Sequence, residues 1–71
     1  MINKYYSLAA KKEGKWVIEY GSFWREDVRE AWAEEKQYYL DNDMKVPKMQ
    51  MLITNCSQNA VMKALNKLNK G

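Results

Sequence analysis

Residues 4–20 read KYYSLAAKKEGKWVIEY, and this stretch decides the fold because it predicts a β-hairpin. Side chains of residues 4–10 alternate between two faces with the two-residue period of a strand. Residues 11–15 are polar and include a glycine, which is typical of a hairpin loop. Residues 16–20 continue the alternation and would pair back onto the first strand. On this second predicted strand, one face carries Trp16, Ile18 and Tyr20, and the other carries Val17 and Glu19.

The next segment predicts an amphipathic helix from about residue 25 to about residue 40. Gly21 and Ser22 end the second strand, and Ser22 is a candidate N-cap because its hydroxyl can accept a helical N–H. Apolar residues recur at helical spacing, and Glu35 interrupts them. The stripe consists of Val28, Ala31, Trp32, Tyr38, Tyr39 and Leu40.

A third strand and a second helix follow. The Val46-Pro47 pair predicts an extended linker, because the residue before proline disfavours helix. Residues 49–54 alternate as a strand, and Ser57 is a candidate N-cap for a helix that reaches residue 68. We therefore expect one α+β domain over residues 1–71, ordered ββαβα, with a three-stranded sheet and both helices packed on one face.

Length and composition restrict the class of protein. A chain of 71 residues has room for one domain, and 46% hydrophobic with 13% aromatic residues is too apolar for a disordered chain. Cys56 stands alone, so no internal disulfide can form. No leader-like or membrane-spanning apolar run is present. We expect a cytoplasmic protein with no membrane partner.

The residue types argue against catalysis. The chain has no histidine, which removes the commonest general base and metal ligand. Cys56 precedes the second predicted helix, and a helix N-terminus can make a thiol reactive. The alternative, which we favour, is that Cys56 is simply a small residue in a turn. Three scattered glycines cannot form a phosphate-binding loop. We expect no cofactor, no metal and no enzymatic activity.

Aromatic residues are more numerous than so small a core needs. Trp16, Tyr6 and Trp32 are predicted core residues, whereas Phe23 and Trp24 are adjacent and cannot both be buried at a helix start. Exposed aromatics near charges are typical anchors for a protein partner. The predicted protein-binding residues are Phe23, Trp24, Arg25, Arg29, Glu30 and Glu34. The alternative is that these aromatics cover the edge of the core and that the acids form a solvated helix face.

The charge pattern supports a second hypothesis. Acids concentrate in residues 19–43, whereas residues 44–71 carry lysines and no acid. Lysines cluster at the predicted hairpin tip and along one face of the second helix, where they could contact phosphates. The nucleic-acid-binding candidates are Lys11, Lys12, Lys15, Lys63, Lys67 and Lys70. Both arginines lie among acids, so base-specific recognition is not expected. The alternative is a solubilising lysine face.

Residues 16–28, WVIEYGSFWREDV, resemble small uncharacterised proteins carried by phages and mobile elements. These proteins share a tryptophan, a strand that ends in Glu-aromatic-Gly, and then an aromatic residue and Arg-Glu at a helix start. Trp24 departs from the pattern, which has an aspartate there as a helix cap. The resemblance implies an accessory protein in a bacterial cytosol with a host or phage protein as partner, and it carries no activity. A homodimer is a further alternative, because a small domain with an unpaired strand edge can self-associate.

Overall fold

The computed structural model of the protein describes residues 4–70 and shows an α+β fold of the predicted ββαβα order. Its sheet has the strand order β2-β1-β3, and both neighbouring pairs are antiparallel. The fold class and element order are therefore confirmed. The elements are β1 (Lys4–Lys12), β2 (Lys15–Ser22), α1 (Arg25–Asp41), β3 (Met49–Asn55) and α2 (Gln58–Lys70). Neither helix is long and apolar enough to cross a membrane.

The hairpin is tighter than the sequence predicted. Strand β1 ends at Lys12 and strand β2 begins at Lys15. The loop therefore consists of Glu13 and Gly14 rather than of residues 11–15. Both loop residues have positive φ, 54° at Glu13 and 78° at Gly14. Two such residues form the turn that matches the right-handed twist of paired strands, and glycine adopts this conformation without a steric cost.

The central strand β1 forms the core. The side chains of residues 7–10 are almost completely buried, with exposed fractions of 0–1%, and Val28 of α1 is also fully buried. Small residues dominate this run, so a helix can approach the strand closely from either side. Trp16, Tyr6 and Trp32, predicted as core residues, are only half-buried. A sheet of three strands is too narrow to surround such large side chains.

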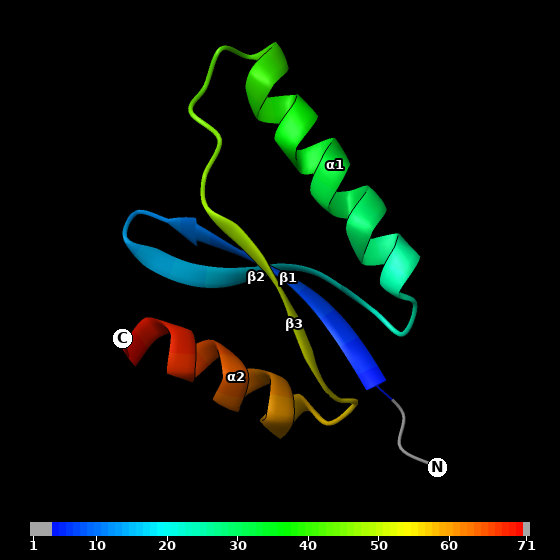
Figure 1. The fold of residues 1–71 in the computed structure, drawn as a ribbon. Coiled ribbons are helices and arrows are strands. Elements are labelled where there is room, and N and C mark those ends of the chain that lie inside the picture. The colour runs from blue at the N-terminus through cyan, green and yellow to red at the C-terminus, as the bar shows by residue number, and fades with distance from the viewer. Residues whose placement is uncertain (1–3, 71) are drawn as a thin grey trace.

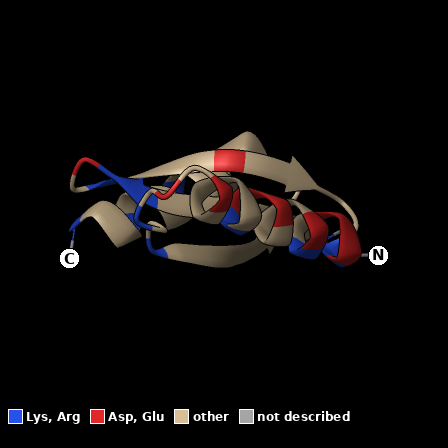
Figure 2. Ribbon diagram, turned by 90° about the horizontal axis from the view of Figure 1, so that it is seen from above, with Lys and Arg blue, Asp and Glu red and all other residues tan. Residues whose placement is uncertain are grey.

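The two helices cover opposite faces of the sheet, which corrects the prediction of both on one face. Helix α1 lies over β1 and β2 on the face that carries Leu8 and Tyr20, and α2 lies over β2 and β3 on the face that carries Ser7 and Ile18. Figure 1 shows α1 and α2 on either side of the strands, and Figure 2 shows α1 in front of them. The reason is that both faces of β1 are apolar and need cover.

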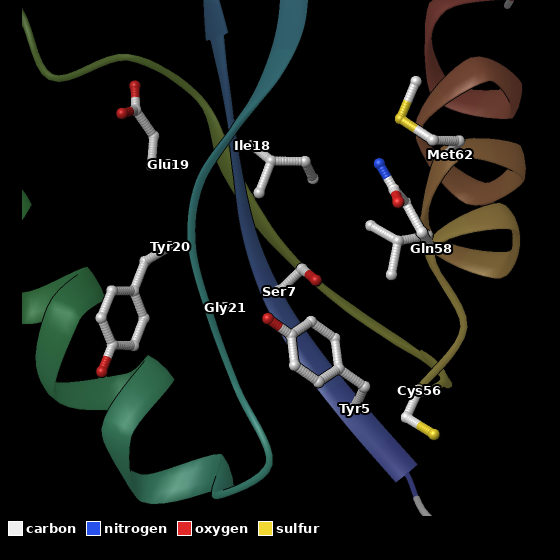
Figure 3. Close-up of a pocket in the computed structure, with 10 residues that line it drawn as sticks. Tyr5, Ser7, Ile18, Glu19, Tyr20, Gly21, Cys56, Gln58 and Met62 are labelled. Atoms are coloured by element: carbon white, nitrogen blue, oxygen red, sulfur yellow. The ribbon is translucent and has the colours of Figure 1, made fainter.

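A β-bulge in β2 changes its predicted faces. Leu8 pairs with Tyr20 and Ala9 with Ile18, which leaves Glu19 as an extra residue in β2. A bulge of this kind turns two successive side chains to the same side. Glu19 and Tyr20 accordingly point toward α1, whereas Ile18 points toward α2 (Figure 3). The prediction that Tyr20 shares a face with Ile18 is therefore wrong.

The helix starts differ in how they are capped. Trp24 is the N-cap residue of α1 and makes no side-chain cap bond, so the prediction of Ser22 as the cap is wrong. The Ser22 hydroxyl instead accepts a hydrogen bond from the Trp24 N–H at 3.0 Å and donates one to Asp27 at 2.8 Å. At α2 the predicted cap is confirmed, because the Ala60 N–H donates to Ser57 Oγ at 3.0 Å.

A glycine is required at position 21 because the Tyr5 side chain approaches the backbone there closely. The Tyr5 ring lies across it and meets the Phe23 ring edge-on, with 5.1 Å between centroids. A Cβ added at Gly21 would come within 2.8 Å of Tyr5 Cζ. The packing of Tyr5 against Phe23, and with it the start of α1, therefore depends on the absence of a side chain at Gly21.

We expect Gly21→Ala to lower the free energy of unfolding by about 1–2 kcal/mol, because the methyl group displaces the Tyr5 ring. Urea denaturation of Gly21→Ala, Tyr5→Leu and the double variant measures this cost. The double variant should be more stable than the sum of the single effects predicts, by about 0.5 kcal/mol or more, since the clash is gone. Simple additivity would show that Tyr5 does not restrict residue 21.

Candidate functional site

A groove runs between α1 and the outer strand β3. Because α1 lies over β1 and β2, the α1-facing side of β3 is only partly covered. The groove has a volume of about 680 Å³, and its apolar floor includes Ile53, which is 54% exposed. Its walls and floor are formed by Arg25, Arg29, Trp32, Ala33, Met51 and Ile53.

Helix α1 carries opposite charges along its two sides. Arg25, Arg29 and Trp32 are spaced four and three residues apart and line the groove beside β3. Glu30 and Glu34 lie on the other side, next to Tyr20 of β2. Figure 2 shows both signs of charge along the helix. The structure therefore divides the predicted protein-binding set, and places only its arginines beside the groove.

The adjacent aromatics Phe23 and Trp24 are both exposed, as predicted. Trp24 is 70% exposed, whereas Phe23 is 55% exposed and has one edge packed on Tyr5. Trp24 directly precedes Arg25 in the chain, and Arg25 is the first α1 residue that lines the groove. We call this combination the α1–β3 surface, which consists of Trp24, Arg25, Arg29, Trp32, Met51 and Ile53.

Neither arginine of the α1–β3 surface forms an ion pair with an acid among residues 4–70. Within residues 4–70, both ion pairs are made by Lys12. The two guanidinium groups are therefore available to carboxylates from another molecule. The predicted protein-binding set contains both arginines but not Met51 or Ile53. Only the position of α1 over β1 and β2 leaves these two side chains open.

The predicted lysine clusters meet at one end of the molecule. The Asn69 side chain accepts a hydrogen bond from the Trp16 N–H at 2.7 Å and donates one to the Trp16 carbonyl at 3.1 Å. These bonds hold the end of α2 beside the hairpin, as Figure 1 shows. Lys67 and Lys70 thus lie at the same end as Lys11 and Lys15, and Lys63 lies one helical turn away. Lys45 and Lys48, which sequence reasoning missed, line a depression with Lys11.

Lys12 is not a free cation, because it is the lysine that forms both ion pairs found among residues 4–70. Its ammonium group pairs with Glu19, lies 3.8 Å from Glu35 Oε1 and sits 5.8 Å from the centre of the Tyr39 ring. The hydrogen bond with Glu19, followed by the one with Tyr39, raises the pKa of Lys12 above its ordinary value. Lys12 therefore joins the hairpin to α1. Because its ammonium group is already paired with Glu19, Lys12 is a poor candidate for binding phosphate.

A second hollow of about 500 Å³ lies between the sheet and α2 (Figure 3). Tyr5, Ile18 and Met62 contribute to its lining. The Ser7 hydroxyl there is fully buried and has no hydrogen-bond partner in the part of the chain that the structure describes. The exposed Cys56 lies at its margin. Among the described residues, acidic and cysteine side chains form no group of three or more that could hold a metal ion.

We expect Ser7→Ala to raise the free energy of unfolding by about 1 kcal/mol, because it removes a buried hydroxyl that lacks a partner. Ser22→Ala is the matched control and should lower it by about 1 kcal/mol, since that hydroxyl makes two hydrogen bonds. Urea denaturation of both variants gives the comparison. A loss of stability in Ser7→Ala would mean that the Ser7 hydroxyl is satisfied after all.

Comparison with known protein families, curated proteins and solved structures finds no match to this chain. Its geometry and sequence therefore carry the functional argument.

Proposed function

We propose that the protein is a small, non-enzymatic protein-binding module that contacts its partner through the α1–β3 surface. The observation that carries this proposal is the 70% exposure of Trp24, the residue before a helix whose Arg25 and Arg29 line an apolar groove and form no ion pair with an acid of residues 4–70. Tryptophan and arginine are enriched among the few residues that contribute most of the binding energy of protein interfaces. An indole left in water has an apolar surface whose burial by a partner is favourable.

The free energy available from burying Trp24 is large enough to contribute substantially to binding. A tryptophan side chain buries 150–250 Å² in an interface, so covering the exposed part of Trp24 would contribute on the order of 2–4 kcal/mol at about 25 cal/mol per Å². Ile53 and Met51 would add apolar contact area, and the arginines would select a partner that carries carboxylates. The resemblance to phage and mobile-element proteins favours a host protein as the partner, with the bacterial cytoplasm as the location and modulation of that protein as the function.

Trp24→Ala should weaken partner binding by about 30-fold or more, the effect of losing an interface residue worth about 2 kcal/mol. Affinity capture from a bacterial lysate, followed by calorimetry with the recovered partner, measures the change. Tyr38→Ala is the matched control, because Tyr38 is 56% exposed near the other end of α1 and should bind normally. Equal capture by all three proteins, or no captured protein, would refute the proposal.

Nucleic-acid binding is the second candidate function, and one observation favours it. The Asn69–Trp16 hydrogen bonds bring the lysines of the hairpin tip and of α2 to one end of the molecule. Lys11, Lys15, Lys67 and Lys70 could there follow a phosphate backbone without reading its sequence. Two arginines in the whole chain, both on α1, make base recognition a poor fit.

If this second function operates, the protein should bind a generic DNA duplex at ~50 mM salt, and the logarithm of the binding constant should fall linearly with the logarithm of the salt concentration above that. Lys15→Ala and Lys67→Ala should each reduce the slope by about 1. Lys12→Ala should leave the slope unchanged, because Lys12 is paired with Glu19. No binding to duplex or single strand at ~50 mM salt would eliminate this candidate.

A further inference from the structure

The two edges of the sheet are treated in different ways. The β2 edge is interrupted by the bulge at Glu19, and Asn69 occupies the backbone N–H and carbonyl of Trp16. Strand β3, Met49–Asn55, contains no charged residue and no proline, and its outer side pairs with no other strand among residues 4–70. Proteins protect exposed strand edges with bulges, charges or covering groups. The β2 edge has such protection and the β3 edge lacks it.

We infer that the outer edge of β3 binds an extended segment of the protein partner as an added strand, and that the segment carries acidic residues at two alternate positions. This inference rests on the proposed protein-binding function. The exposed backbone of β3 would supply hydrogen bonds, as in other complexes in which a peptide extends a sheet. The α1–β3 groove would receive every second side chain of the segment.

The spacing of the two arginines determines where the partner segment should carry its acidic residues. Arg25 and Arg29 are one helical turn apart, which is about 6 Å along the axis. Alternate residues of a strand are about 6.6 Å apart and point to the same face. Helix α1 runs in the opposite direction to β3 on that face (Figure 1). Two carboxylates at positions i and i+2 of an added strand would therefore match the two guanidinium groups.

A second copy of this chain fits the edge poorly. Its own β3 reads MQMLITN and brings no carboxylate to Arg25 or Arg29. Antiparallel pairing of two β3 strands would also place the arginine sides of both α1 helices toward each other across the symmetry axis, where like charges repel. Charge complementarity thus favours an acidic segment from a different protein.

Two blocked peptides test the inference directly. Thr-Val-Glu-Val-Glu-Val-Thr should bind at least about tenfold more tightly than the same peptide with lysine at both glutamate positions, because two carboxylate–arginine pairs are lost and repulsion replaces them. Its binding should also slow amide hydrogen exchange within residues 49–55. The double variant Arg25→Glu/Arg29→Glu should reverse the preference and bind the lysine peptide more tightly.

Lys63→Glu/Lys67→Glu is the matched control, with the same change of net charge on α2, and should retain the preference for the glutamate peptide. Equal affinity for both peptides, unchanged exchange in β3, or a dimer of the free protein in light scattering would overturn the inference. A captured partner that depends on Trp24 but leaves β3 exchange unchanged would overturn strand addition alone. The protein-binding function itself would then still stand.

Discussion

Burial of the central strand β1 on both faces is the constraint on which the structure depends. Ser7, Leu8, Ala9 and Ala10 are all at most 1% exposed, although they belong to a sheet of only three strands. A strand buried on both sides needs a cover on each face, and the chain has one helix for each. Because three of these four side chains are small, α1 and α2 can both lie close to the strand. The positions of the remaining elements follow from this arrangement.

Because of this arrangement, a partner cannot bind to the faces of the sheet. With a helix on each face, the remaining sites are the two edges, the flanks of the helices and the ends of the molecule. The bulge and Asn69 protect the β2 edge. The β3 edge is open and has an apolar groove and two arginines above it. The surface best suited to a partner is therefore a consequence of how the core is covered.

Element type and order could be predicted from the sequence because each segment has a clear period. The two-residue alternation of 4–10, 16–20 and 49–54 and the helical spacing from Val28 to Tyr39 are local properties. Ser57 as a cap and the exposure of Phe23 and Trp24 were also accessible, since both depend on residues nearby in the chain. The protein-binding and nucleic-acid hypotheses remain predictions.

The features that the sequence could not show arise from contacts between distant segments. An alternating pattern does not reveal an inserted residue, so the bulge at Glu19 was missed and Tyr20 was placed on the wrong face. The pairing of Lys12 with Glu19 depends on that bulge. The assignment of the helices to opposite faces required the observation that both sides of β1 are buried. The Asn69–Trp16 bonds join residues 53 positions apart, and no local signal indicates them.

Amide hydrogen exchange of the free protein, measured residue by residue by NMR, tests most directly whether β1 is the doubly covered centre and β3 an open edge. The structure predicts the slowest exchange in residues 7–10 of β1, at rates set by global unfolding. In β3, amides that bond to β1 should exchange slowly and those on the outer side rapidly, in alternation. Uniformly slow exchange along β3, or exchange in β1 as fast as in the hairpin turn, would contradict this account.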